Sequence, residues 1–211
     1  MEKLYLIIDT ETANDIQDNL YYDLGYAVID TQGVVYEQGS FVNVDIFDYP
    51  ELMESAYYAE KMPLYLHGIS NGEHKAKTHA QIRGIIRHIM AKYGINAVIA
   101  HNCPFDRRAL NNTERYITCS KYRYFFPYGT QYIDTLALAR KVMKGNDEYV
   151  TFCNENGYLT AYGKPRHTAE ILYRFITKDN EFVESHTGLQ DVLIEKEIFA
   201  YCVRNGAVIE L

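Results

Sequence analysis

The sequence predicts an α/β protein: a mixed sheet that opens with three antiparallel strands and gains a parallel strand through a helical crossover. Short turn residues between the first apolar runs predict the antiparallel strands. A helical repeat over residues 78–92, followed at once by an apolar run at 96–100, predicts the crossover and the parallel strand. These patterns together indicate the α/β class.

The opening strand is predicted from the apolar residues 4–8, which are too few for a comfortable helix and typical of a strand buried on both faces. Asp9 and Glu11 follow, and because side chains alternate along a strand, they project to the same face. Two carboxylates this close raise each other's pKa unless a cation lies between them, and Mg²⁺ or Mn²⁺ suits oxygen ligands. The same residues are compatible with a simpler role, in which Asp9 and Thr10 only start a turn.

The next segments predict two more strands and then an irregular lobe. Residues 24–29 form the second strand, residues 30–33 a tight turn, and residues 34–38 the start of the third strand. Residues 43–80 are interrupted by proline and glycine, and they contain at most one short helix, near residues 51–58. We expect this part to be a lobe that covers one end of the sheet.

A second candidate motif follows the crossover. A helix is predicted over residues 78–92 because isoleucines recur there at helical spacing, and the buried strand at 96–100 comes next. Asn102 can then cap the following helix, which leaves Asp106 in the first turn, where unpaired amides and the helix dipole favour a negative charge. Asp106 is well placed to share a metal ion with Asp9, although stabilising its own helix would be a sufficient role.

The middle of the chain is less informative. Residues 121–128 alternate basic and aromatic side chains, which could stack on single-stranded nucleic acid or could pack under the sheet edge. Residues 132–134 form a short final strand, and Asp134 caps a helix over residues 136–144 instead of joining the site. Residues 145–166, rich in glycine and asparagine, are predicted to be an extended loop.

The last quarter of the chain predicts two helices and a second pair of candidate groups. Apolar spacing predicts a helix over residues 168–176, and a closing helix starts near Asp191. Each helical residue turns roughly 100°, so His186 and Asp191 would point about 140° apart within one helix. His186 must therefore lie on the preceding loop if both serve one site. Taken alone, such a histidine is more often a surface residue than a catalyst.

Composition and charge exclude several classes of protein. With 47% hydrophobic residues, 23% charged residues and no apolar run of membrane-spanning length, we expect an ordinary soluble domain formed by residues 1–211. The start lacks the features of a signal peptide, so a cytoplasmic location is expected. The net charge of -7 argues against a protein that coats nucleic acid, but not against an enzyme whose acidic groups hold cations.

The cysteines show no paired spacing of the kind that zinc sites use, and we expect them to remain free thiols without a disulfide. They are Cys103, Cys119, Cys153 and Cys202.

Four short motifs stand at separated points of the chain. They are Asp9-Thr10-Glu11-Thr12, His101-Asn102 with Phe105-Asp106, Ile133-Asp134-Thr135, and His186 five residues before Asp191. Together they resemble the DEDD family of 3′–5′ exonucleases, histidine subtype, over nearly the whole chain. The tyrosine subtype would place a tyrosine at Thr187. The family includes the proofreading subunits of bacterial replicative polymerases, ribonuclease T and oligoribonuclease.

The resemblance implies a ribonuclease H-like fold, with a mixed five-stranded sheet, first three strands antiparallel, and helices on both faces. It also implies two divalent metal ions, Mg²⁺ or Mn²⁺, about 3.5–4 Å apart at the scissile phosphate. The implied metal ligands are Asp9, Glu11, Asp106 and Asp191. Asp9 would bridge both ions, and His186 would be the general base. The implied substrate contacts are Thr10, Thr12, His67, Asn102 and Phe105.

The implied activity is hydrolysis from the 3′ end of single-stranded nucleic acid, with DNA favoured over RNA and nucleoside 5′-monophosphates released. The alternatives are an RNA-processing exoribonuclease or oligoribonuclease-like enzyme, a phosphodiesterase or nuclease that acts on small nucleotides or nicked duplexes, and a non-catalytic nucleic-acid-binding protein on this fold. A DNA polymerase or another replication or repair protein is the implied protein partner. No membrane partner is expected, and the oligomeric state stays open.

Some residues depart from the family pattern. Gly188 stands where the family usually has alanine, and Ala13-Asn14 replace a frequent Thr-Gly. Either change could alter how the terminal base is held without removing the chemistry. The sequence ends at residue 211, twenty residues after Asp191, without the tail that ties polymerase-associated members to their partner. A free-standing or differently recruited enzyme is therefore expected.

Overall fold

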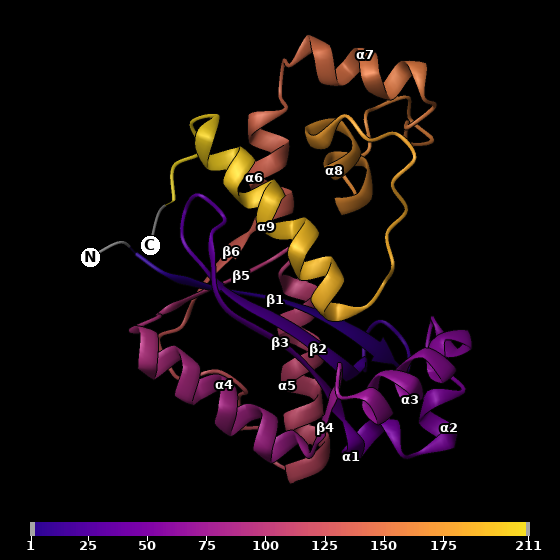
Figure 1. Ribbon diagram of the computed structural model, residues 1–211, viewed down its shortest axis with the longest axis vertical. Coiled ribbons are helices and arrows are strands. Elements are labelled where there is room, and N and C mark those ends of the chain that lie inside the picture. The colour runs from indigo at the N-terminus through magenta and orange to yellow at the C-terminus, as the bar shows by residue number, and fades with distance from the viewer. Residues whose placement is uncertain (1–2, 210–211) are drawn as a thin grey trace.

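The computed structural model describes residues 3–209 and confirms the α/β class (Figure 1). Its sheet has six strands in the order β4-β3-β2-β1-β5-β6; β1 to β3 are antiparallel, and β5 and β6 run parallel to β1. The strands are β1 (Tyr5–Ala13), β2 (Leu20–Ile29), β3 (Val35–Asn43), β4 (Lys75–Lys77), β5 (Ala97–Ala100) and β6 (Gln131–Asp134). Met1 and Glu2, at the start of the predicted domain, and residues 210–211, at its end, lie outside the described residues.

The sixth strand is the one that sequence patterns missed. β4 is three residues long, pairs in parallel with β3 at the edge of the sheet, and reads Lys-Ala-Lys. Short, charged edge strands are common because they discourage pairing with other chains, but they carry no apolar alternation that a pattern could detect. The prediction of five strands was therefore one short.

The opening strand is buried on both faces, as predicted. Tyr5 and Ile7 point into one core with helices α6, α8 and α9, whereas Leu6 and Ile8 point into a second core with α4 and α5. These helices are α4 (His79–Tyr93), α5 (Pro104–Thr118), α6 (Thr135–Val142), α8 (Ala169–Thr177) and α9 (Gly188–Arg204). Figure 1 shows the two groups of helices on opposite sides of the strands. The prediction of helices on both faces is confirmed.

Residues 43–80 contain more helix than the sequence predicted. The segment forms α1 (Val44–Phe47), α2 (Pro50–Met53), the 3₁₀ helix η1 (Ala59–Lys61) and α3 (Met62–Asn71) before β4. Pro63 falls in the first turn of α3, where a missing amide costs nothing, and Gly72 ends α3 with a left-handed conformation at φ 85°. Gly68 lies inside α3 against the His74 ring. The prolines and glycines that suggested a loop are thus helix boundaries and a packing contact.

Residues 145–166 were also wrongly predicted as loop. They contain α7 (Asp147–Glu155), which is capped by the Asn146 side chain accepting from the Tyr149 amide at 2.9 Å. Only Tyr149 and Cys153 of this helix are buried, so its apolar stripe is too short to produce a clear helical period. All four cysteines are free, as expected. Within residues 3–209, no helix combines the length and apolar character needed to cross a membrane.

Candidate functional site

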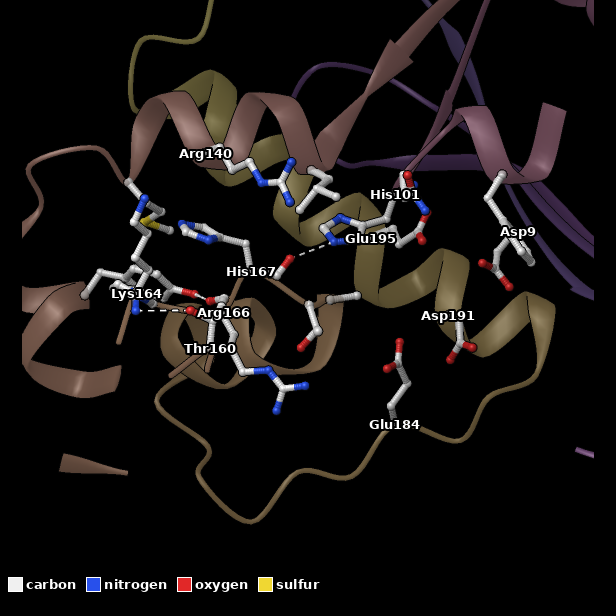
Figure 2. Close-up of a pocket in the computed structure, with 18 of the residues that line it drawn as sticks. Asp9, His101, Arg140, Thr160, Lys164, Arg166, His167, Glu184, Asp191 and Glu195 are labelled. Carbon is white, nitrogen blue, oxygen red and sulfur yellow. Dashed lines mark hydrogen bonds between the residues drawn. The ribbon is translucent and has the colours of Figure 1, made fainter. Parts of the chain in front are cut away.

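One cavity of about 1020 Å³ opens beside the C-terminal half of β1 and the first turn of α9. Asp9 and Glu11 both line it, as the alternation of side chains along the strand predicted. Asp191 and His186 line it too, and Figure 2 shows Asp9 and Asp191 at one end of the cavity. Two distant parts of the sequence therefore meet at one place.

Asp106 joins this group from behind the cavity wall. It is buried in the first turn of α5, and its Oδ1 accepts hydrogen bonds from the Thr10 amide at 3.1 Å and the Thr10 hydroxyl at 2.8 Å. Its charge also raises the pKa of Asp9. The predicted approach of Asp106 to the opening strand is thus present, but Asp106 does not itself line the cavity.

Glu11, His186 and Asp191 form the tightest group of possible metal ligands. One ligand atom from each lies within 4.8 Å of the other two. Asp191 is buried, and its Oδ1 has no hydrogen-bond partner among the described residues. An unpaired buried carboxylate oxygen is costly unless a cation binds it. The two carboxylates of this group fit a divalent cation at this end of the cavity, with the imidazole beside them.

His186 lies on the loop before α9, as the five-residue offset required. Its backbone is left-handed at φ 52°, and its ring stacks on Tyr58 with 4.5 Å between ring centroids and 14° between planes. The Lys61 ammonium donates hydrogen bonds to the backbone carbonyls of Ser185 and His186. Tyr58 directly precedes η1, and Lys61 is its last residue. These two residues therefore hold the loop in place.

The site gathers several buried carboxyl groups, and their pKa values are all raised. Burial is the largest cause in every case, and it raises the pKa to about 9 for Glu11, about 8 for Asp191 and about 7 for Asp106. Burial and repulsion between carboxylates hold the pKa of Asp9 and of Glu195 well above the usual range. Bound cations would reverse this cost, because they favour the ionised carboxylates.

Glu195 was missed by the sequence analysis. It is buried on α9 one turn after Asp191, lines the cavity, and accepts a hydrogen bond from the His101 amide at 3.1 Å. The four-residue spacing from Asp191 puts both carboxylates on one helix face, which was a usable signal. Glu184 was missed as well; burial raises its pKa to about 7, and its charge raises the pKa of Asp191. Nothing in its loop sequence indicated this.

The predicted substrate contacts divide into two groups. Asn102 and Phe105 line the cavity, whereas Thr10, Thr12 and His67 do not. The Thr10 side chain is buried against Asp106. His67 is exposed on α3, because the expected loop around it is a helix that turns this side chain outward.

Asn102 does not cap α5 with its side chain. Cys103 occupies the capping position without a side-chain hydrogen bond, and Asn102 is left-handed at φ 63°. The backbone amide of Asn102 instead donates to the Asp134 carboxylate at 3.0 Å. Asp134 also accepts from the Leu136 amide at 3.0 Å, so it caps α6 as predicted and stays outside the cavity lining.

The start of α9 is pressed directly onto β2. A Cβ atom on Gly188 would lie 2.5 Å from the Gly25 amide nitrogen, and a Cβ atom on Gly25 would lie 2.0 Å from the Gly188 carbonyl carbon. The Gly188 amide donates to the buried Asp23 carboxylate at 2.9 Å. A side chain at position 188 would clash with β2, which explains the glycine there. The contact also fixes the position of the first turn of α9, and with it Asp191, relative to the sheet.

The basic and aromatic segment 121–128 lies away from the cavity. It follows the C-terminal end of α5, about 22 Å from the first turn at the usual helical rise. Phe125 and Phe126 are buried, whereas Tyr122 and Tyr128 are exposed. Part of the segment therefore packs against the core, as one of the two alternatives predicted.

No family model and no curated protein matches this chain. Its fold is similar to that of solved exonuclease I structures. E. coli exonuclease I in complex with an oligonucleotide has a TM-score of 0.60 at 17% identity, and the match covers 94% of this chain and 40% of that one. The zinc-bound form of the E. coli enzyme with single-stranded DNA has a TM-score of 0.56 at 14% identity, and the match covers 93% of this chain and 39% of that one.

Exonuclease I from Methylocaldum szegediense gives a TM-score of 0.58 at 16% identity, with 91% of this chain and 38% of that chain covered. This chain thus spans about two fifths of the length of these structures. At such low identity the likeness shows a shared fold, which agrees with the predicted fold class.

Proposed function

We propose that this protein is a metal-dependent 3′–5′ exonuclease that hydrolyses single-stranded nucleic acid, with DNA favoured over RNA. The observation that carries the proposal is the buried, unbalanced group of carboxylates around Asp9, with a histidine at its edge. The shared fold with exonuclease I structures that contain single-stranded DNA or an oligonucleotide supports the substrate class.

In this proposal the metal ligands are Asp9, Glu11, Asp106 and Asp191, with Glu195 as a further buried carboxylate beside them. Bound there, two Mg²⁺ or Mn²⁺ ions would offset the charge that develops on the scissile phosphate and make the attacking water more acidic. The Thr10 amide and hydroxyl would hold Asp106 in place through its Oδ1.

His186 is the proposed general base. Burial, with a further contribution from Lys61, lowers its pKa, so the imidazole is neutral near pH 7 and able to take a proton from water. The water oxygen bonds to phosphorus, and the bond from phosphorus to the 3′ oxygen breaks. The 3′ oxygen of the shortened strand takes up a proton from solvent, and a nucleoside 5′-monophosphate leaves. Tyr58 would orient the His186 ring by stacking.

A non-catalytic nucleic-acid-binding protein is less well supported. Such a protein would gain nothing from several buried carboxylates whose pKa values are raised by burial and mutual repulsion. An RNA-specific exonuclease is the second candidate, because the residues that line the cavity do not discriminate between deoxyribose and ribose. A cytoplasmic location, a single domain and association with a DNA polymerase or another replication or repair protein stay predictions.

The test uses 5′-labelled single-stranded DNA and RNA oligomers with Mg²⁺ or Mn²⁺, with and without chelator. We expect stepwise shortening from the 3′ end, release of nucleoside monophosphates and complete loss with chelator. His186→Ala should lower the rate by about 10²–10⁴-fold. The matched control is His88→Ala, because His88 is exposed on α4 away from the cavity. Internal cuts, or activity that ignores the chelator, would refute the proposal.

A further inference from the structure

The cavity has a second end whose charge is opposite to that of the carboxylate end. Arg140 and Lys144 line it from α6 and the residues just after that helix, and Lys164 and Arg166 line it from the segment after α7. Figure 2 shows Arg140, Lys164 and Arg166 on the side of the cavity away from Asp9 and Asp191. These four cations are called the basic arm below.

The segment that carries half of the basic arm is held firmly. Leu159 and Pro165 form an antiparallel bridge, and the Thr160 amide donates to the Lys164 carbonyl at 2.8 Å. The Arg166 amide donates to the Tyr158 carbonyl at 3.0 Å. These bonds make a short hairpin, so the two cations are presented in a defined geometry.

The buried Tyr149 and the half-buried His101 anchor this hairpin to the protein interior. The Tyr149 hydroxyl donates a hydrogen bond to the Arg166 carbonyl. His101, at the end of β5, lies 2.9 Å from the His167 carbonyl through its Nε2. Since a carbonyl oxygen only accepts, Nε2 carries the proton and donates. His101 thus connects the strand that precedes Asp106 to the end of the basic arm.

The cations of the basic arm lack acidic partners. Among residues 3–209, no ion pair joins Arg140, Lys144, Lys164 or Arg166 to an aspartate or glutamate. The chain has 28 acidic and 21 basic residues, so partners are abundant elsewhere. Unpaired cations gathered on one wall of a cavity favour an anionic ligand, and arginine suits phosphate in particular.

The chemistry of a 3′ end indicates which phosphates these are. The terminal nucleotide brings only the scissile phosphate, which belongs at the carboxylate end. Every other phosphate lies in the remaining strand, on the 5′ side of the scissile bond. Ligand cavities usually measure about 300–1,000 Å³, so a cavity of about 1020 Å³ has room for more than one nucleotide.

We propose that the basic arm binds the phosphates on the 5′ side of the scissile bond, so that the strand runs from the carboxylate end toward Arg140 and Arg166. This inference rests on the proposed exonuclease function. It makes the preferred substrate an oligonucleotide with at least one phosphate beyond the one that is cut. The arm contributes binding and alignment, and it takes no part in the chemical step.

The experiment compares two substrates with the native protein and with the double variant Arg140→Ala/Arg166→Ala. One is a single-stranded DNA oligomer; the other is the p-nitrophenyl ester of thymidine 5′-monophosphate, in which nitrophenolate replaces the rest of the strand. The variant should lose about 10-fold in kcat/KM per cation on the oligomer, mainly through KM, since one charge-assisted hydrogen bond is worth about this much. Hydrolysis of the ester should stay within about twofold.

The matched control is Lys141→Ala/Arg204→Ala, which removes two exposed cations that do not line the cavity. It should behave like the native protein on both substrates. An equal loss on oligomer and ester, or no loss on the oligomer, overturns the proposal for the basic arm. Failure of the native protein to cut either substrate overturns the exonuclease function instead.

Binding without catalysis gives an independent readout in that last case. Fluorescence anisotropy of a labelled single-stranded oligomer, measured in chelator at several salt concentrations, reports the phosphate contacts directly. The double variant should bind more weakly, and the slope of log K against log salt should fall by about 0.7 for each lost contact. An unchanged slope and affinity would overturn the basic arm whether or not the protein is a nuclease.

Discussion

Two groups of buried ionisable residues in this protein contrast in how their charges are balanced. Between α4 and α5, the His79 Nε2 lies 2.6 Å from Glu114 Oε2, and the Arg83 Nε lies 3.2 Å from the same oxygen. The Tyr21 hydroxyl lies 3.0 Å from the other nitrogen of His79. At the cavity, by contrast, carboxylates surround one another, with burial and repulsion raising their pKa values.

An unpaired oxygen alone does not distinguish the two groups. Glu114 Oε1 and Asp191 Oδ1 are both buried without a hydrogen-bond partner among the described residues. The difference is the net charge: Arg83 supplies a cation to Glu114, whereas Asp191 is surrounded mainly by other acids. A buried group with balanced charges indicates a role in folding, and one with an excess of negative charge indicates a site that binds a cation.

The largest predicted effect separates activity from stability at the cavity. Asp191→Asn should lower exonuclease activity more than about 100-fold, because even residues that only support metal ligands contribute 10–100-fold. The same change should raise the melting temperature in chelator at pH 8, because it removes one of several repelling buried carboxylates. Differential scanning fluorimetry beside the nuclease assay measures both. A variant that loses both activity and thermal stability would contradict the proposed difference between the two buried groups.

The balanced group should respond in the opposite way. Glu114→Gln leaves the buried His79 and the half-buried Arg83 without their anion, and breaking a buried pair in this way costs about 3–5 kcal/mol of unfolding free energy. Urea unfolding measures this loss, and kcat of the folded variant should stay near the native value. Since the contact between Arg83 and the Phe125 carbonyl remains, the fold should survive. A neutral effect on stability would show that the pair is not needed.

The third prediction uses pH and metal together. The pKa values of Asp106, Asp191 and Glu11 are raised to about 7, 8 and 9, so these groups favour the folded state when protonated. That contribution is complete below the unfolded-state pKa of about 4 and is lost as pH rises through about 7–9. The melting temperature of the metal-free protein should therefore fall between about pH 5 and pH 9.

Divalent cations should reverse this fall. At a hundred times the dissociation constant, Mg²⁺ or Mn²⁺ would add about 2.7 kcal/mol, or about 5–11 °C for a chain of this size. The gain should be larger at pH 8 than at pH 5.5, because only the ionised carboxylates bind. Equal gains at both pH values would indicate binding elsewhere.

The smallest predicted effect concerns Lys61, a cation at the carboxylate end of the cavity. Its charge lowers the pKa of Glu11, Asp191 and His186. Lys61→Met should therefore move the acidic limb of the pH-rate profile to higher pH, with a loss of a few fold at pH 6.5 and little loss at pH 9. A uniform loss at every pH would instead indicate that Lys61 acts only through its hydrogen bonds to the loop.

Local sequence patterns were enough to predict much of this arrangement. The period of two along β1 placed Asp9 and Glu11 on one cavity, and the five-residue offset placed His186 on a loop beside Asp191. These predictions succeeded because each depends on backbone geometry over a few residues.

The residues that were missed depend on contacts between distant segments. Tyr58 meets His186, and Glu195 meets the His101 amide, only after the sheet and α9 have come together. His67 lies on a helix instead of the expected loop, because proline and glycine mark helix boundaries as readily as loops. Short apolar stripes, such as that of α7, carry too little periodicity to be recognised alone.

The glycine contact between β2 and α9 has a consequence for how the protein is made. Residues 25 and 188 are far apart in sequence, so Asp191 can dock beside Asp9 and Glu11 only after both segments have been synthesised and have packed together. A chain synthesised only as far as α8 would contain Asp9 and Glu11 but would lack Asp191 beside them. Under the proposed function, such a partial chain would not cleave cellular nucleic acid.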